Sequence, residues 1–277
     1  MEISTNIQTQ WLVVTDLDGT LLDHHSYSFS PAKQTLEKLR QLRIPVIINS
    51  SKTTREIQAL RIALNNQHPF IVENGSAVLI PQDYFLEPPQ NSKPWEKYWE
   101  VILGRPRAEI LNALEKLPDS LRACFTHYHS MSIAELVKAT GLSPKEAEQS
   151  ADRYYTEPLQ WLGTKEQKQT LYNALNKQGI HYTEGGRFIH VMGHTNKGSA
   201  TTWLAELYRK QYKQKMKIVS LGDGSNDVDM LKAADIAVVI RSPVNQAPQF
   251  DHPCKIISDG YGPQGWAEAI EHIFSEH

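Results

Sequence analysis

Val13-Val14-Thr15-Asp16-Leu17-Asp18-Gly19-Thr20 is the stretch that decides the fold, because an apolar run passes into two carboxylates two residues apart. The apolar run predicts a buried strand. Alternate side chains on an extended backbone face the same way, so Asp16 and Asp18 are expected to converge where the strand ends. Open parallel sheets bind their ligands at that edge. Two close carboxylates repel each other unless a cation lies nearby, and Mg²⁺ prefers oxygen ligands. The alternative is a strand and an Asx turn without chemistry.

Predicted helices and predicted buried strands alternate after this stretch and again near the end of the chain. The helices are expected from apolar residues at helical spacing, and the strands from short apolar runs. The predicted elements are, in chain order, helix 31–43, strand 45–48, helix 54–64, strand 70–72, helix 198–211, strand 217–221, a helix through Met230 and Leu231, strand 236–240, and a last helix that begins after Gly262-Pro263. This alternation predicts an α/β fold with a doubly wound parallel sheet.

The middle of the chain breaks this pattern. Short helices are predicted to begin at the N-cap residues Ser132, Ser143 and Thr164, of which Ser143 is followed by a proline. Gly185-Gly186 predicts a hairpin between two strands. We therefore predict a catalytic core made of residues 1–83 and 191–277, interrupted by an α+β cap domain over residues 84–190. An insertion placed between strand-end loops is expected to lie over the open ends of the sheet.

Composition limits the possible partners and the compartment. The 277 residues carry a formal net charge of −2, so no basic field attracts nucleic acid or a membrane surface. No apolar run approaches the roughly 18 residues of a transmembrane helix, and residues 1–10 lack the pattern of a secretory signal. Cys124 and Cys254 are far apart in the sequence and lack the spacing of metal ligands. This pattern indicates two reduced thiols in a cytoplasmic protein. We expect a cytoplasmic monomer or homodimer that binds a small molecule.

Four polar clusters follow or precede elements of the predicted sheet. They are Asp16 with Asp18, Ser50 with Lys52, Lys197 alone, and Asp223 with Asp227. Carboxylates, hydroxyls and an ammonium group at one edge suit phosphoryl transfer assisted by Mg²⁺. Aspartate can serve as the nucleophile, and a second aspartate can protonate the leaving oxygen and later deprotonate water.

The arrangement resembles the haloacid dehalogenase superfamily of phosphatases. Asp16-Leu17-Asp18-Gly19-Thr20 is similar to its first motif, Ser50 to the second, Lys197 to the third, and Gly222-Asp223-Gly224-Ser225-Asn226-Asp227 to the fourth. The resemblance implies that Asp16 is the nucleophile, that Asp18 is the acid/base, and that Ser50 and Lys197 hold phosphoryl oxygens. It also implies that Mg²⁺ is bound by the Asp16 and Asp223 carboxylates and the Asp18 backbone carbonyl, with Asp227 supporting the site directly or through water.

The inserted segment resembles the type II cap of the Cof-like branch, and four stretches are similar to the mannosyl-3-phosphoglycerate phosphatases. These are Ile71–Gly75, Thr140–Ser143, Arg153–Pro158 and Gly185–His190. That family converts 2-O-(α-mannosyl)-3-phosphoglycerate into mannosylglycerate, a compatible solute. The second motif here reads Ser50-Ser51-Lys52 where many relatives have Thr-Gly-Arg, and the fourth has the general Cof-like form. A glucosyl-specific enzyme, a broader sugar phosphatase and a non-enzymatic phosphosugar-binding regulator are the alternatives; the intact aspartates and lysine argue against the last.

Several further residues are predicted to bind the substrate. Arg187 suits a carboxylate clamp, with a solvated cap edge as the alternative. Arg153 and Glu157 are either substrate ligands or a surface i,i+4 ion pair on a helix, and the turn at 73–75 is expected to meet sugar hydroxyls or Lys197. His190 and His194 are interpreted as hairpin and loop histidines without a zinc site. The complete predicted set is Ser51, Lys52, Glu73, Asn74, Gly75, Arg153, Glu157, Arg187 and Asn226.

Overall fold

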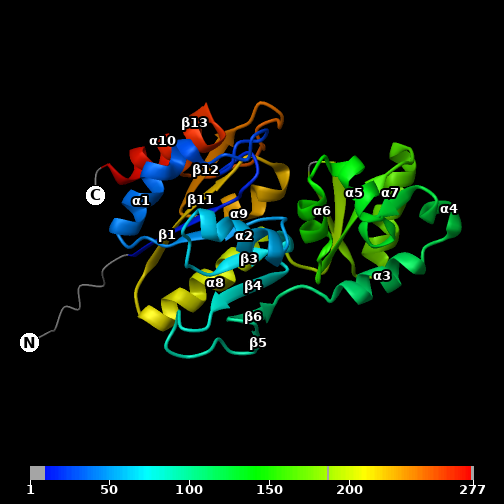
Figure 1. Cartoon of the computed structure of the whole chain (residues 1–277), viewed down its shortest axis with the longest axis horizontal. Coiled ribbons are helices and arrows are strands. Elements are labelled where there is room, and N and C mark those ends of the chain that lie inside the picture. Colours follow the sequence, from blue (N-terminus) through cyan, green and yellow to red (C-terminus); the bar gives the residue numbers. More distant parts are fainter. Residues whose placement is uncertain (1–9, 186, 276–277) are drawn as a thin grey trace, which may run out of the picture.

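The computed structural model describes residues 10–185 and 187–275, which form two lobes joined by crossing segments (Figure 1). The larger lobe holds a nine-stranded sheet in the order β13-β12-β11-β1-β2-β3-β4-β6-β5, and the smaller lobe a four-stranded sheet in the order β7-β8-β10-β9. Residues 1–9, where we expect no signal sequence, lie outside the described part. Across the described ranges, no helix has both the length and the apolar character that a membrane crossing requires.

Six neighbouring strands of the large sheet run parallel, as the sequence predicts. They are β1 (Gln10–Thr15), β2 (Val46–Asn49), β3 (Phe70–Val72), β11 (Met216–Gly222), β12 (Ile236–Arg241) and β13 (Lys255–Tyr261). Three antiparallel strands extend one edge: β4 (Ala77–Pro81), β6 (Tyr98–Ile102) and β5 (Lys93–Trp95). The α/β prediction is confirmed.

Helices cover both faces of this sheet, because each strand supplies apolar side chains to both. On β1, Val13 belongs to one cluster, while Leu12 and Val14 belong to the other. The first cluster includes residues of α1 (Lys33–Gln41), α2 (Thr54–Ala63) and α10 (Gly262–Phe274), and the second includes residues of α8 (Lys197–Tyr212) and α9 (Val228–Lys232).

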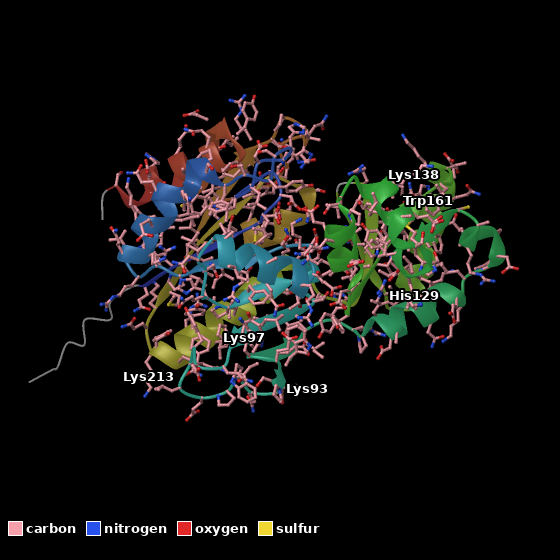
Figure 2. All side chains as sticks on the ribbon, in the orientation of Figure 1. Lys93, Lys97, His129, Lys138, Trp161 and Lys213 are labelled. Atoms are coloured by element: carbon pink, nitrogen blue, oxygen red, sulfur yellow. The ribbon has the colours of Figure 1, made fainter. Side chains whose placement is uncertain are left out.

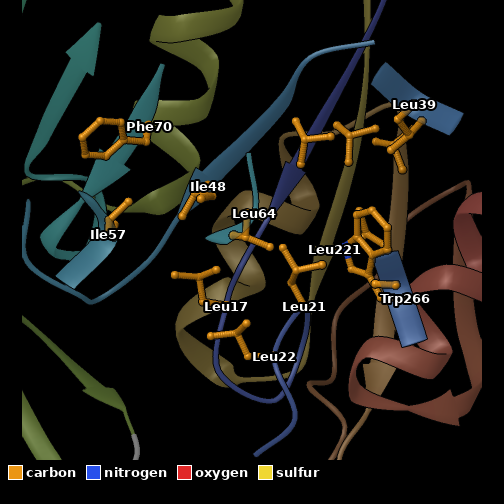
Figure 3. Close-up of a cluster of buried hydrophobic side chains, with 14 of the residues drawn as sticks. Leu17, Leu21, Leu22, Leu39, Ile48, Ile57, Leu64, Phe70, Leu221 and Trp266 are labelled. Carbon is orange, nitrogen blue, oxygen red and sulfur yellow. The ribbon is translucent and has the colours of Figure 1, made fainter. Parts of the chain in front are cut away.

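The first cluster supports the end of β1 from below. Figure 3 shows Trp266 of the last helix next to Leu221 of the neighbouring strand β11, and Leu39 of another helix belongs to the same cluster. Trp266 is completely buried, and its indole Nε1 donates a hydrogen bond of 3.0 Å to Thr15 Oγ1. Thr15 Oγ1 in turn donates to the backbone carbonyl of Asp16 at 2.7 Å. The last helix therefore fixes the backbone that carries the first motif.

The smaller lobe is an antiparallel sheet with helices. Its strands are β7 (Phe125–His127), β8 (Thr156–Trp161), β9 (His181–Gly185) and β10 (Phe188–Met192), and its helices are α3 (Arg107–Glu115), α4 (Asp119–Arg122), α5 (Ile133–Thr140), α6 (Pro144–Ala151) and α7 (Lys165–Lys177). Ile189 and Val191 of β10 pack with α3 and α7. Their neighbours along the strand, Phe188 and His190, point to the other face of the sheet. The predicted hairpin joins β9 to β10; Gly186 lies outside the described residues.

The two crossings between the lobes lie later in the chain than predicted. We expected the inserted module to begin at residue 84, but β5 and β6 pair with the large sheet. Lys93 and Lys97 mark this hairpin on the larger lobe in Figure 2. The proline-rich segment 88–94 resembles a linker in composition, although it connects strands of one sheet. We propose residues 103 and 192 as the approximate limits of the inserted unit.

Candidate active site

The four polar clusters meet at one edge of the large sheet. Asp16 follows β1, Ser50 follows β2, and Asp223 follows β11. Strand β1 lies between β2 and β11, and these strands are parallel, so their carboxyl ends share one edge. Helix α8 begins at Lys197, which brings the predicted third motif to the same place.

Lys197 is the centre of the site. Its side chain is fully buried, and its Nζ lies 2.6 Å from Asp16 Oδ1 and 2.6 Å from Asp227 Oδ1. Burial alone would lower the pKa of the Lys197 ammonium, but the two carboxylates outweigh this effect and raise that pKa above its ordinary value. Lys197 is therefore a fixed positive charge beside the predicted nucleophile.

Three carboxylates form a compact acidic cluster. Oxygens of Asp16, Asp223 and Asp227 all lie within 4.8 Å of one another. Burial raises the pKa of Asp16, the Lys197 ammonium opposes this, and the neighbouring carboxylates add to the increase. Burial and the Asp227 charge also raise the pKa of Asp223. Crowded carboxylates without enough cations form the oxygen-rich environment that suits a divalent ion.

Hydrogen bonds orient the cluster. Asp223 Oδ1 accepts from Thr20 Oγ1 at 3.0 Å, and its Oδ2 accepts from Asn245 Nδ2 at 2.8 Å. Gly19, with φ of +78°, leaves room for this carboxylate, because a methyl group there would lie 2.6 Å from Asp223 Oδ2. The residues present therefore fit a divalent metal ion.

Asp18 has different surroundings. Its carboxylate is outside the three-residue cluster. Lys52 Nζ lies 2.9 Å from Asp18 Oδ2 and 3.9 Å from Glu56 Oε1, and Asp18 Oδ1 is buried without a hydrogen-bond partner. One oxygen is thus held by a cation while the other is free, a state that suits proton transfer.

Ser50 lies in the turn that follows β2. The side chain is buried, and its Oγ accepts a hydrogen bond from the Lys52 N–H at 3.3 Å. The Ser50 carbonyl accepts from the Asn74 N–H at 3.0 Å. The first bond stabilises the turn, and the second joins the end of β2 to the end of β3.

A cavity of about 730 Å³ separates the acidic cluster from the smaller lobe. Its walls come from both lobes and from the loop after the first motif. Core residues on its surface include Asp16, Asp18, Ser51, Lys52, Glu56, Asp223, Asn226 and Asn245. Loop and cap residues include His24, His25, Tyr27, Tyr128, Thr140, Leu142, Ser150, Arg153, Arg187, Phe188 and His190. Five predicted substrate ligands therefore line one space: Ser51, Lys52, Arg153, Arg187 and Asn226.

The two cap arginines differ in exposure. Arg153 is 8% exposed, and its Nη1 donates to Thr156 Oγ1 at 2.8 Å and to the Ser51 carbonyl at 3.2 Å. Its Nε is buried without a partner. Arg187 is exposed and donates to the Thr140 carbonyl. Arg153 thus reaches from the cap to the core, whereas Arg187 lies at the rim.

Glu73 contacts the cap backbone rather than Lys197 or the cavity. Its carboxylate accepts from the backbone N–H groups of Tyr154, Tyr155 and Thr156 at 2.8–3.3 Å and from Thr156 Oγ1 at 2.7 Å. Arg153 Nη1 lies 3.8 Å away. The sequence could not reveal this contact, because it depends on how the chain returns from the insertion.

Asn74 and Gly75 contact the residues that directly precede Asp227 and Lys197. Asn74 Oδ1 accepts from Asn226 Nδ2 at 3.3 Å. Gly75 has φ of +92°, and a methyl group there would lie 2.2 Å from the Asn196 carbonyl oxygen. This close approach places the first turn of α8, and with it Lys197, against the end of β3.

Glu157 lies on β8, in a strand, so the helical ion pair with Arg153 does not form. The Glu157 side chain is fully buried and accepts from Arg107 Nε at 2.5 Å, from the His129 N–H at 2.7 Å, and pairs with His127 Nδ1 at 3.1 Å. These contacts lie inside the cap, and Glu157 is absent from the cavity lining among the described residues.

Sequence reasoning missed several residues of the cavity. Asn245 follows β12, so the strand-end argument applied to one more strand would have found it. Tyr27 and the two preceding histidines follow the first motif in a loop, and no pattern singled them out. His190 was interpreted as structural, although its place between Ile189 and Val191 predicts that it faces away from the cap helices.

Comparisons with known proteins agree with this geometry. A sequence profile of haloacid dehalogenase-like hydrolases matches residues 13–249. A glucosyl-3-phosphoglycerate/mannosyl-3-phosphoglycerate phosphatase of Persephonella marina is 34% identical over 269 residues, which cover 96% of this chain and 97% of the relative. A protein of the same name from Methanococcoides burtonii is 32% identical over 271 residues, with 96% and 98% covered.

Solved structures show the same fold. A haloacid dehalogenase-like hydrolase from Bacteroides thetaiotaomicron matches with a TM-score of 0.65 at 19% identity, covering 96% of this chain and 100% of that one. The sucrose-phosphatase from Synechocystis, solved with sucrose and phosphate, matches with a TM-score of 0.60 at 16% identity, covering 96% and 98%. The profile and the two phosphatase relatives make the chain a phosphoric monoester hydrolase, and it belongs to the haloacid dehalogenase-like hydrolases.

Proposed function

We propose that this protein is a Mg²⁺-dependent phosphatase that hydrolyses 2-O-(α-mannosyl)-3-phosphoglycerate to mannosylglycerate and phosphate. The observation that carries the proposal is the carboxylate of Asp16, which the buried Lys197 bridges to Asp227 and which lines a cavity that also holds Arg153 and Arg187. The bridge suits a phosphoryl group, and arginines suit a carboxylate such as that of glycerate. The glucosyl ester is the second candidate, because both relatives carry both substrates in their names.

The metal would be held by the Asp16 and Asp223 carboxylates and the Asp18 backbone carbonyl, with Asp227 in support. When bound, Mg²⁺ supplies positive charge that offsets the charge of the phosphoryl oxygens. Lys197 and Ser50 would bind phosphoryl oxygens from buried positions next to the cavity residues Asp16 and Ser51, and Asn226 lines the cavity itself. The surrounding protein excludes water, which strengthens each of these contacts.

The reaction follows from the two aspartates of the first motif. An oxygen of Asp16 attacks phosphorus, the bond from phosphorus to the glycerate 3-oxygen breaks, and Asp18 gives its proton to that oxygen. Water then attacks the aspartyl-phosphate, Asp18 takes the proton, and Asp16 departs as a carboxylate. Lys52, 2.9 Å from Asp18 Oδ2, holds the Asp18 carboxylate in place while Oδ1 carries the proton.

We further propose that the enzyme acts in the cytoplasm as a monomer or a homodimer. The structure pairs neither Cys124 nor Cys254 in a disulfide, and Cys254 is exposed. Exposed free thiols are typical of reducing compartments. Light scattering on the purified protein measures the oligomeric state; a mass of three or more chains would contradict this proposal.

A phosphate-release assay tests the function. The panel contains mannosyl- and glucosyl-3-phosphoglycerate, sucrose phosphate, trehalose phosphate and hexose phosphates, each with Mg²⁺ and with excess chelator. We expect Mg²⁺-dependent release from the mannosyl ester, and loss of at least ~10⁴-fold in kcat for Asp16→Asn, which removes the nucleophile without changing its shape. Comparable rates on hexose phosphates would favour a broad sugar phosphatase. Tight binding of one of these esters without turnover of any would favour a regulator.

A further inference from the structure

His190 lines the cavity and has no role in the proposed reaction. Strand β10 places Ile189 and Val191 in the cap core, so His190 faces the other side of the sheet and lines the cavity. Its side chain belongs to a residue only 7% exposed, and its Nδ1 is buried without a hydrogen-bond partner. A buried polar atom without a partner is costly, and ligand sites are where such atoms are tolerated.

Arg153 also lines this cavity and has a second buried donor without a partner. Its Nη1 bonds leave Nε buried and without a partner. The carboxylate of Glu73 lies 3.8 Å from Nη1, but that carboxylate already accepts four hydrogen bonds from Tyr154, Tyr155 and Thr156. The Tyr128 ring lies 5.6 Å from the guanidinium carbon and limits its movement. Arg153 is therefore a rigid cation with unused hydrogen-bonding capacity.

The electrostatic field around His190 is positive. Burial lowers the pKa of His190 to about 3, and the charges of Arg153 and Lys197 contribute to the decrease. His190 is consequently a neutral imidazole whose N–H donates without protonation. Lys197 is already balanced by Asp16 and Asp227. Arg153 is paired less closely, with Glu73 at 3.8 Å, so it is the cation near His190 that is most able to bind a further anion.

The position of His190 relates this anion to the phosphoryl group. A methyl group on Gly185 would lie 3.7 Å from His190 Cδ2 and 3.9 Å from Asn226 Cγ. Asn226 directly precedes Asp227, the partner of Lys197. An anion between His190 and Arg153 is therefore close to the phosphoryl site, on the side toward the cap, where the leaving group must lie.

We propose that Arg153 and His190 together form a subsite that binds a carboxylate on the leaving group, and that this subsite selects phosphate esters with an acid close to the ester bond. The inference rests on the proposed function and adds a recognition role for both residues. It assigns Arg187, which is exposed and bonded to the Thr140 carbonyl, to the outer end of the ligand.

Two matched esters test the selection. One is the glycosyl-3-phosphoglycerate that the enzyme turns over best, and the other is its analogue with the carboxylate reduced to a primary alcohol. We expect the wild-type kcat/KM to favour the acid by ~100-fold, since a site built for a charged partner rejects a ligand that lacks it. His190→Leu and Arg153→Gln should each reduce this ratio at least ~10-fold, whereas His190→Asn, which keeps an amide N–H, should reduce it less.

Matched controls are available on the far side of the cap. Arg122 of α4 is an exposed arginine paired with Asp119, and His129, labelled in Figure 2, is an exposed histidine of the same lobe. Arg122→Gln and His129→Leu should leave the acid-to-alcohol ratio at the wild-type value. Folded His190 and Arg153 variants with an unchanged ratio would overturn the inference.

A binding measurement on the wild-type chain covers the case in which a variant does not fold. The imidazole ¹⁵N signals of His190, assigned from their absence in His190→Asn, should shift when the product glycosylglycerate is added. Glycosylglycerol should leave them unchanged. Equal shifts with both compounds would overturn the carboxylate subsite. Absence of turnover of either ester would refute the proposed function, and the product titration would still decide the subsite.

Discussion

The two walls of the cavity differ in how completely their polar groups are paired. On the core wall, Asp16 is paired with the buried Lys197, and both oxygens of Asp223 accept hydrogen bonds. On the cap wall, Arg153 Nε and His190 Nδ1 are buried without partners. The core wall is thus preorganised for one reaction. The cap wall instead has unpaired polar atoms that can form hydrogen bonds with groups of a particular substrate. Among the described core residues that line the cavity, the exception is Asp18 Oδ1, the oxygen that we assign to proton transfer.

The largest expected effect breaks the pairing of the core wall. Lys197→Met leaves Asp16 and Asp227 as uncompensated buried carboxylates, so we expect about 3–5 kcal/mol lower free energy of unfolding and ~10³-fold lower kcat. Urea unfolding and phosphate release measure the two. Lys210→Met, an exposed lysine on the same helix, is the control. Adding Asp227→Asn should restore part of the stability but no activity; a stable Lys197→Met protein would show that the bridge is not needed for folding.

A smaller effect concerns the joint between the walls. Glu73→Gln keeps the shape of the side chain but replaces the carboxylate with an amide that has only one oxygen. In the wild type, the N–H groups of Tyr154, Tyr155 and Thr156 donate to both carboxylate oxygens. The substitution also leaves Arg153 without its nearest anion. We expect about 1–3 kcal/mol of destabilisation, with faster hydrogen exchange at the amides of Tyr154, Tyr155 and Thr156. Glu115→Gln, at an exposed position of α3, should change neither. Unchanged exchange at these amides would mean that Glu73 does not hold the cap.

The pH dependence of stability tests the cap wall. The pKa of His190 is about 3 in the folded chain and 6.5 as its ordinary value. Below pH 6.5 the His190 imidazole binds a proton in the unfolded state but stays neutral in the folded state. The free energy of unfolding therefore falls as the pH drops toward 3. At pH 5 this term is about 2 kcal/mol. The stability difference between wild type and His190→Gln should therefore shift by this amount between pH 7 and pH 5, in favour of the variant. A parallel pH profile for His190→Gln would contradict a neutral, buried imidazole.

The smallest expected effect concerns the orientation of Asp223, one of the proposed metal ligands. Asn245→Ala removes the 2.8 Å hydrogen bond to Asp223 Oδ2. Partners of metal ligands orient them, so we expect ~10-fold more Mg²⁺ for half-maximal activity with little change at saturation. Asn173→Ala, at an exposed cap position, serves as the control. An unchanged Mg²⁺ requirement would remove Asn245 from the metal site.

The sequence predicts the core wall well and the cap wall poorly, for a physical reason. Asp16, Ser50 and Asp223 each follow a strand, and parallel strands bring their ends to one edge whatever the rest of the chain does. Lys197 was placed by the motif and lies where expected. Side chains of the insertion depend on the return path of the chain. Glu157 was assigned a helical spacing although Pro158 and Leu159 continue a strand.

Contacts between the lobes were similarly hidden. Glu73 follows β3, so the strand-end argument suggested a cavity ligand, yet its carboxylate meets backbone groups that arrive about eighty residues later. The β5–β6 hairpin was assigned to the insertion because its proline-rich approach has the composition of a linker. His190 required knowledge of which face of β10 the cap helices cover.

The hydrogen bond from Trp266 to Thr15 has a consequence for how the enzyme is made. Thr15 and Trp266 are 251 residues apart, Asp16 and Lys197 are 181 apart, and Thr20 and Asp223 are 203 apart. A ribosome therefore releases the first motif long before the lysine, the second acidic motif and the supporting tryptophan exist. Such distant contacts form late in folding. No partial chain can hydrolyse a phosphate ester by this mechanism, so the appearance of activity during synthesis or refolding marks the completion of the whole core.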